Sequence, residues 1–124
     1  MATPARILVV DHEPLIQRLL ARALASEGFE VECQSDGKAA LAWAQDADPP
    51  FDLIITNSRL PHLHGDELTL RLRERFPHLP VIHVSGGDGG QFAWRFPDDV
   101  PWVRKPFRVE ELVEKVRIML ARSS

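Results

Sequence analysis

The stretch Ile7-Leu8-Val9-Val10-Asp11-His12-Glu13-Pro14 decides the fold class of this protein. Its four consecutive aliphatic residues are typical of a strand that is buried on both faces, as in parallel sheets. Polar residues end the strand, and proline suits the first turn of a helix. A buried strand followed directly by a helix predicts the first unit of an α/β fold.

The same alternation continues along the chain. Apolar residues at helical spacing after Pro14 predict a helix that ends near Gly28. Further strands are predicted within 29–33, 51–56, 81–84 and 102–103, and further helices over 38–45, from about 66 to 76 and after 106. Ser35 or Asp36 is the expected N-cap of the second helix. This order predicts a parallel sheet covered on both faces, with right-handed crossovers.

Two features bear on the last part of the sheet. The glycine-rich run over 86–90 predicts that any fourth helix is short or late, because glycine disfavours helices. Pro101 places the fifth strand at a sheet edge, since proline cannot donate to a hydrogen-bonded ladder. We therefore expect five strands and five helices, with the fourth helix the least regular.

Composition limits the classes of function. The chain has 124 residues, 44% hydrophobic and 27% charged, and its net charge is −3. These values predict one soluble domain over residues 1–124 without an output domain, and they argue against nucleic-acid or membrane partners. Cys33 is the single cysteine, which excludes an internal disulfide and favours the cytoplasm. No apolar run is long enough for a signal peptide or a membrane span.

The candidate site lies where the strands end. In open parallel sheets, ligands bind beyond the carboxyl ends of the strands, at the point where strand order reverses. The residues that directly follow the predicted strands are Asp11, His12, Glu13, Asn57, Ser58, Arg59, Ser85 and Lys105.

Four segments in this order and at these separations resemble the receiver domains of response regulators in two-component signalling. They are Ile7 to Pro14, Asp52 to Asn57 with Leu60-Pro61 and Gly65, Val81 to Gly86, and Lys105-Pro106-Phe107. The resemblance implies a flavodoxin-like, doubly wound α/β fold with a five-stranded parallel sheet in the order 2-1-3-4-5. It also implies a cis peptide bond between Lys105 and Pro106.

The family transfers a phosphoryl group to an aspartate at the end of the third strand, with Mg²⁺ held by two acidic residues after the first strand. By this resemblance Asp11 matches the first acid, whereas His12 stands at the second and Asn57 at the phosphoacceptor position. Ser85 and Lys105 match the residues that contact the phosphoryl group. Arg59 stands where a backbone carbonyl binds the metal, and Trp102 where an aromatic switch residue is common.

These departures predict a pseudo-receiver that is not phosphorylated. The amide of Asn57 is a poor nucleophile. One carboxylate, one amide and one imidazole make a poor Mg²⁺ site, so we expect Mg²⁺ binding to be weak or absent and no other cofactor to be needed. Glu13 is expected to begin the helix and point away. Lys105 is then expected to pair with Asp11 or to hydrogen-bond Asn57.

The implied function is signalling by protein–protein contact, without catalysis. The expected partner is a histidine kinase, a phosphotransfer protein or another regulator. A homodimer could form through the face made by the fourth helix, the fifth strand and the fifth helix. The aromatic residues Phe92, Trp94, Phe96 and Trp102 either anchor that interface or fill the core where a regular helix is missing.

Other interpretations stay open. The chain could be a conventional receiver that uses Ser58 or Asp11 as acceptor, or one that carries an engineered aspartate-to-asparagine change at position 57. His12, and His64 where the family loop often carries aspartate, favour natural divergence. The pocket could instead bind a small molecule, or a transition metal through His12, His62 and His64. His12 beside Asp11 could also act as a pH sensor.

Overall fold

The computed structural model describes residues 3–47, 51–87 and 93–123. The strands are β1 (Arg6–Val10), β2 (Glu30–Gln34), β3 (Leu53–Thr56), β4 (Val81–Ser85) and β5 (Trp102–Arg104). Among the described residues the α-helices are α1 (Pro14–Ser26), α2 (Gly37–Asp46), α3 (Gly65–Arg75) and α4 (Val109–Ser123). Neighbouring strands are parallel and lie in the order β2-β1-β3-β4-β5. The predicted doubly wound, flavodoxin-like fold is confirmed.

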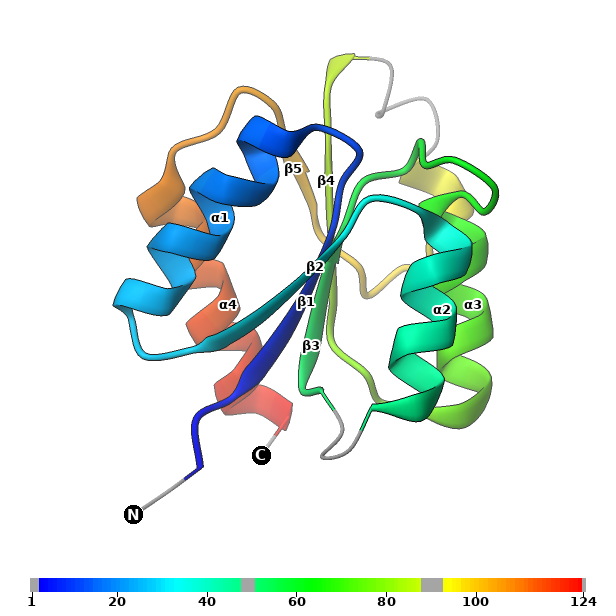
Figure 1. Cartoon of the computed structure of the whole chain (residues 1–124), viewed down its shortest axis with the longest axis horizontal. Helices are drawn as coiled ribbons and strands as arrows, with labels where there is room; N and C mark the ends of the chain where they lie inside the picture. Colours follow the sequence, from blue (N-terminus) through cyan, green and yellow to red (C-terminus); the bar gives the residue numbers. More distant parts are fainter. Residues whose placement is uncertain (1–2, 48–50, 88–92, 124) are drawn as a thin grey trace.

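Helices cover both faces of the sheet, with α1 and α4 on one side and α2 and α3 on the other (Figure 1). The alternation of side chains along β1 explains this arrangement, because successive residues point to opposite faces. Ile7 and Val9 pack in the cluster on the α1 and α4 side. Leu8 and Val10 pack in the cluster on the α2 and α3 side. Burial on both faces is what the unbroken aliphatic run predicts.

Local signals set the ends of the helices. Pro14 is the first residue of α1, and Gly28 follows the helix with a φ of 93°, which favours glycine. Asp36 is the N-cap of α2, and its carboxylate accepts a hydrogen bond from the backbone N–H of Ala39 at 3.0 Å. Of the two predicted N-cap residues, Asp36 is therefore the one that caps α2.

The segment between β4 and β5 differs from the five-helix prediction. Residues 93–95 form a single 3₁₀ turn, and no α-helix is found in the described part of this connection. Most of the glycine-rich run, residues 88–90, lies outside the described residues. The predicted fifth helix is thus the fourth α-helix in Figure 1. β5 lies at the sheet edge, as Pro101 predicts, and the Lys105–Pro106 bond is cis, as the resemblance implies.

Within the described part of the chain, no helix combines the length and the apolar character that crossing a membrane requires.

Candidate functional site

The candidate site lies at the carboxyl ends of the central strands, where backbone hydrogen bonds tie four chain segments together. The Asn57 N–H donates to the Val10 carbonyl at 3.0 Å, and the Lys105 N–H donates to the Ser85 carbonyl at 2.8 Å. The sheet order reverses at β1 and β3, so Asp11 and Asn57 follow neighbouring strands. The predicted pocket residues Asp11, Asn57, Ser85 and Lys105 are therefore assembled at one edge of the sheet.

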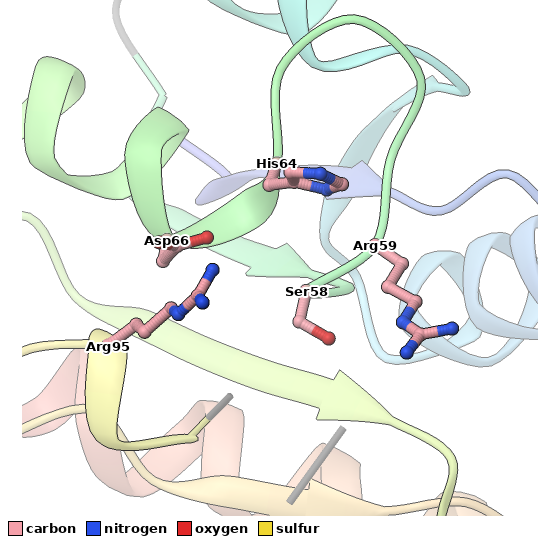
Figure 2. A pocket seen from close by; sticks show the side chains of 5 residues that line it. All are labelled: Ser58, Arg59, His64, Asp66 and Arg95. Atoms are coloured by element: carbon pink, nitrogen blue, oxygen red, sulfur yellow. The ribbon is translucent and has the colours of Figure 1, made fainter. Parts of the chain in front are cut away.

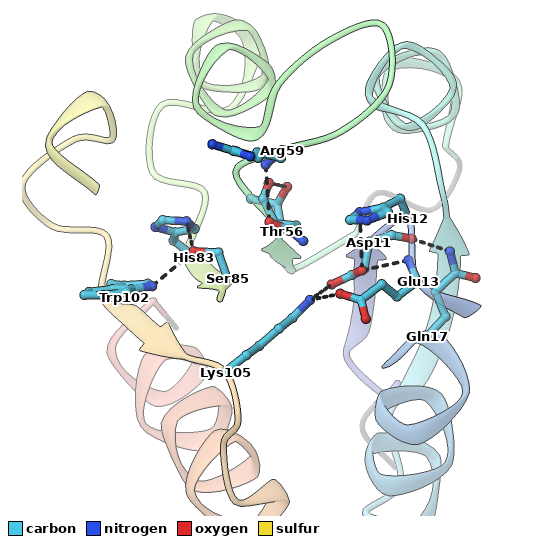
Figure 3. Close-up of polar contacts among 11 residues, drawn as sticks. Asp11, His12, Glu13, Gln17, Thr56, Arg59, His83, Ser85, Trp102 and Lys105 are labelled. Carbon is cyan, nitrogen blue, oxygen red and sulfur yellow. Dashed lines mark hydrogen bonds and ion pairs between the residues drawn. The ribbon is translucent and has the colours of Figure 1, made fainter. Parts of the chain in front are cut away.

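Lys105 crosses the pocket and pairs with two carboxylates (Figure 3). Its Nζ donates to Asp11 Oδ2 at 2.8 Å and to Glu13 Oε1 at 2.9 Å. Burial would lower the pKa of Lys105, but the hydrogen bonds and charges of the two carboxylates outweigh burial and raise it. The hydrogen bond and the charge of Lys105 in turn lower the pKa of Glu13.

The expected orientation of Glu13 is wrong. Glu13 lies at the N-cap of α1, but its carboxylate turns toward Lys105. Its backbone N–H also donates to Asp11 Oδ1 at 2.9 Å. Residue spacing places Glu13 at the helix start, but it cannot predict that Lys105, 92 residues away and just after β5, draws the side chain inward.

Asn57 is buried, and its amide is held by its own loop. The Oδ1 atom accepts a hydrogen bond from the backbone N–H of Arg59 at 3.2 Å. The two hydrogen bonds of Lys105 go to carboxylates, so of the two predicted arrangements the pairing with Asp11 is the one found. The loop after Asn57 is compact because Gly65 approaches it closely. A Cβ added at Gly65 would lie 1.9 Å from the Asn57 carbonyl oxygen.

Ser85 and His83 are buried and form a hydrogen-bonded chain with the partly exposed Trp102 (Figure 3). Its Oγ lies 2.8 Å from His83 Nε2, and it accepts a hydrogen bond from Trp102 Nε1 at 3.1 Å. The indole donates to Ser85 Oγ, and the imidazole tautomer of His83 sets the direction of the Ser85–His83 hydrogen bond. Burial lowers the pKa of His83 to about 4, which keeps the imidazole neutral near pH 7. Ser85 Oγ thus lies within hydrogen-bond distance of two aromatic side chains.

Sequence reasoning missed His83 as a site residue. It is a polar residue inside the otherwise apolar run Val81 to Val84, and this interruption was the available signal. The ring stacks on Phe96 with centroids 4.2 Å apart, and the Trp102 ring lies 6.3 Å away on a similar plane. Phe96 therefore fills the core, whereas Trp94 is 77% exposed. Phe92 lies outside the described residues.

The three histidines of the metal hypothesis have separate environments. His12 is half-exposed, with Nδ1 3.9 Å from Asp11 Oδ1. His62 has a left-handed φ of 66° and pairs with Asp36, the cap of α2. His64 precedes α3 and lines a cavity together with Ser58, Arg59, Asp66 and Arg95 (Figure 2). In the described part of the chain, no group of three or more histidine, cysteine or acidic side chains is placed to hold a metal ion.

The donor set also fits Mg²⁺ poorly. Mg²⁺ requires hard oxygen ligands and usually one or two carboxylates. Asp11 is the buried carboxylate of the pocket, and its Oδ2 is already bound by the ammonium of Lys105. Glu13 is half-exposed and bound by the same ammonium, and the Asn57 oxygen is neutral. Lys105 thus provides the positive charge that a metal ion would otherwise supply to these carboxylates.

Comparison with known proteins identifies the family. The model of the response regulator receiver domain matches residues 7–117. A probable transcriptional regulatory protein, TcrX of Mycobacterium tuberculosis, is 32% identical over 97% of this chain and 51% of its own length. The transcriptional regulatory protein TcrA of the same organism is 35% identical over 94% of this chain and 46% of its own length. The chain spans about half the length of these curated relatives.

Solved structures agree with the sequence comparison. A CheY-like response regulator receiver domain protein from Methanospirillum hungatei superposes with a TM-score of 0.86 and 26% identity, covering 98% of this chain and 97% of that one. A response regulator receiver protein from Sinorhizobium medicae gives a TM-score of 0.90 at 24% identity, covering 98% of both chains, which supports the fold. The chain therefore belongs to the response regulator receiver domain family.

Proposed function

We propose that this chain is a two-component receiver module that does not accept a phosphoryl group and that signals through protein contacts. The observation that carries the proposal is Asn57, a buried amide at the end of β3 whose Oδ1 is held by the Arg59 backbone. An amide oxygen is a much weaker nucleophile than a carboxylate, so an acyl phosphate should not form there.

The charges of the pocket support the same conclusion. Phosphoryl transfer depends on cations that stabilise the anionic group in the transition state. The ammonium of Lys105 is instead neutralised by Asp11 and Glu13 at hydrogen-bond distance. Moving Lys105 toward a phosphoryl group would leave the buried carboxylate of Asp11 without its partner, which is costly.

Ser85 gives independent support. A hydroxyl that is to bind a phosphoryl oxygen must donate its hydrogen to that oxygen. In this chain the Ser85 hydroxyl lies between the Trp102 indole and the neutral imidazole of His83. Turning it toward a phosphoryl group would disturb its hydrogen bonds with the buried imidazole of His83 and the partly exposed indole of Trp102.

The curated relatives are transcriptional regulatory proteins, and this chain corresponds to about half of their length. We propose that the partner of this module is a protein: a histidine kinase, a phosphotransfer protein or another regulator. A second copy of the chain is a further possible partner, through the face formed by β5, α4 and the turn at residues 93–95. We assign the module no catalytic residue.

Incubation with acetyl phosphate and Mg²⁺, followed by intact-protein mass spectrometry, tests the loss of phosphorylation. We expect no gain of about 80 Da, the mass of one phosphoryl group. The matched control is the Asn57→Asp, His12→Asp double variant, which restores the nucleophile and the second acid. We expect this variant to gain the mass, and the single Asn57→Asp variant to gain less because its metal site remains poor.

A stable gain of that mass in the unaltered chain would contradict the proposal. Peptide mapping would then identify the acceptor, with Ser58→Ala and Asp11→Asn as the informative variants. If the double variant also gains no mass, the assay is not capable of detecting transfer in this pocket, and radiolabelled phosphoramidate replaces acetyl phosphate as the donor.

A further inference from the structure

The outer surface of α1 carries a stripe of apolar and basic side chains. Leu15 and Leu19 lie one turn apart, and they are 74% and 44% exposed. Arg18 and Arg22, also one turn apart, are exposed beside them. Isolated exposed leucines are common on protein surfaces, but neighbouring ones with charged residues around them indicate contact with another molecule. We call these four residues the basic stripe of α1.

The positive charge of the basic stripe is not neutralised by the chain itself. Within residues 3–47, 51–87 and 93–123, neither Arg18 nor Arg22 forms an ion pair. Helix α1 contains no acidic residue. The glutamates that flank it, Glu13 and Glu27, are bound by the lysine after β5 and by an arginine of α4. Two guanidinium groups on α1 therefore remain available to an acidic partner.

The neighbouring helix α4 is acidic on the outer surface of its first two turns. A shallow groove of about 540 Å³ runs along it, lined by Arg108, Glu110, Glu111, Glu114, Lys115 and Ile118. All three glutamates are exposed, and they outnumber the two basic residues. Glu114 lies 3.9 Å from Arg117, whereas Glu110 and Glu111 form no ion pair with any described residue. We call this groove the acidic groove of α4, and its charge is opposite to that of the basic stripe.

The basic stripe and the acidic groove lie at similar levels on the same side of the molecule. Helices α1 and α4 contact each other on one face of the sheet (Figure 1). Both follow parallel strands and therefore run in the same general direction. The ion pair between Glu27 and Arg117 shows which turns of the two helices are neighbours. The same offset places Arg18 and Arg22 near the level of residues 108 and 112, in the turns that hold the glutamates.

We infer that the face formed by α1 and α4 binds a second copy of this chain, with the basic stripe of each copy on the acidic groove of the other. A two-fold axis that passes between the helices, along their direction, places α1 of one copy opposite α4 of the other. The same axis makes the second contact identical to the first. A second copy is the fitting occupant because both complementary surfaces belong to one face of one chain.

This face differs from the one formed by β5, α4 and the turn at residues 93–95. The inference goes beyond the proposed function and does not depend on the loss of phosphorylation, because it involves neither Asn57 nor Ser85. Helices of 13 and 15 residues are about 20 Å long, so two adjacent helices present a face of roughly 400 Å². A standard interface buries about 800 Å² on each partner. We therefore expect a weak dimer that salt weakens further.

Analytical ultracentrifugation of the full chain tests the inference. Protein concentrations between about 10 µM and 1 mM cover the range in which weak complexes form. We expect a monomer–dimer equilibrium at about 50 mM sodium chloride, and a shift toward monomer at about 500 mM, because salt screens exposed charges.

A charge exchange between two variants makes the test specific. One variant carries Arg18→Glu and Arg22→Glu, and the other carries Glu111→Lys and Glu114→Lys. Each variant alone should dimerise at least about tenfold more weakly than the unaltered chain, because like charges then meet at both contacts. A mixture of the two should dimerise again, since each acidic surface then meets a basic one. This recovery also shows that both variants are folded.

Trp94→Ser is the control on the other face. Trp94 lies in the turn at residues 93–95 and is 77% exposed, away from α1. Its replacement should leave the dimerisation constant within about twofold, because the basic stripe and the acidic groove are unchanged.

Three results would overturn the inference. The first is a chain that stays monomeric at every concentration. The second is a dimer that the Arg18→Glu, Arg22→Glu variant still forms with unchanged affinity, or a mixture of the two variants that does not recover dimerisation. The third is a dimer that Trp94→Ser abolishes, which would place the contact on the face formed by β5, α4 and the turn at residues 93–95.

Discussion

At the level of single residues, the ion pairs of Lys105 are the main electrostatic feature of the pocket. The side chains of Asp11 and Lys105 are 3% and 13% exposed, whereas that of Glu13 is 49% exposed. Breaking a buried pair leaves an uncompensated charge away from water, but an exposed pair is screened. The two carboxylates therefore contribute unequally to the stability of the folded protein, although their distances to Lys105 Nζ are nearly the same.

This difference gives a stability prediction. Asp11→Asn should lower the free energy of unfolding by about 3 kcal/mol, because Lys105 loses its buried partner and the Glu13 N–H loses its acceptor charge. Glu13→Gln should cost less than about 1 kcal/mol. Urea denaturation at pH 7 measures both values. Equal costs for the two variants would contradict the assignment of Asp11 as the dominant partner.

Sequence reasoning succeeded in placing the residues at or just after the carboxyl ends of the strands. Asp11, Asn57, Ser85 and Lys105 meet because parallel strands bring their carboxyl ends to one edge. It failed for Glu13, whose carboxylate binds Lys105, and it missed His83, whose ring packs beside Phe96 and Trp102. Local sequence contains no information on such distant partners.

At the level of the elements, the connection between β3 and α3 is set by a close backbone approach. The Gly65 N–H donates to the Ser58 carbonyl at 2.9 Å, and Gly65 packs against the Asn57 carbonyl. Helix α3 starts at this glycine, so its position determines where the first turn of α3 meets the site. The sequence shows a glycine at position 65, but the close backbone contact that requires it is visible only in the tertiary structure.

Gly65→Ala should therefore destabilise the protein by about 2 kcal/mol or more, since the new Cβ would lie 1.9 Å from a backbone oxygen. Gly86→Ala is the matched control. A Cβ at Gly86 meets no heavy atom of the described structure within 4 Å, so the change should stay within about 0.5 kcal/mol. Chemical denaturation compares the two variants. A Gly65→Ala protein as stable as Gly86→Ala would show that the loop relaxes freely.

Element boundaries were predicted to within a few residues where polar caps or glycines end an apolar pattern. The third strand begins at Leu53 and not at 51, since Phe51 packs in the α2 and α3 cluster before the ladder starts. The fourth helix is replaced by the 3₁₀ turn in the described part of its connection. The glycine content predicted that a regular fourth helix would be short or late, but it did not predict the 3₁₀ turn at residues 93–95.

At the level of the whole molecule, buried His83 makes stability depend on pH. The folded protein holds its pKa at about 4, whereas an unburied imidazole has a value near 6.5. Between these values the unfolded chain binds a proton at this site and the folded chain does not, so stability falls as pH decreases from 6.5 to 4. The full effect is about 3 kcal/mol.

His83→Phe should remove this slope. Phenylalanine can still stack on Phe96, and it cannot bind a proton. Thermal denaturation at several pH values between 6.5 and 4.5 measures the change, with His78→Gln as an exposed-histidine control that should keep the slope. The lowered pKa of Glu13, caused by Lys105, acts in the same direction but below its ordinary value of 4.5. A His83→Phe protein with the wild-type slope would contradict the prediction.

The sequence by itself determined the parallel α/β fold, the strand order implied by the receiver resemblance and the set of residues at the strand ends. It could do so because burial on both faces of a strand, helical periodicity and caps are local patterns. Tertiary structure alone decided which partner each polar group takes. Lys105 binds Asp11 and Glu13, Ser85 binds His83 and Trp102, and Ser58 lines a second cavity without a partner among the described residues. These choices depend on distances between segments far apart in the chain, and such distances are set only when the sheet and its helices pack together.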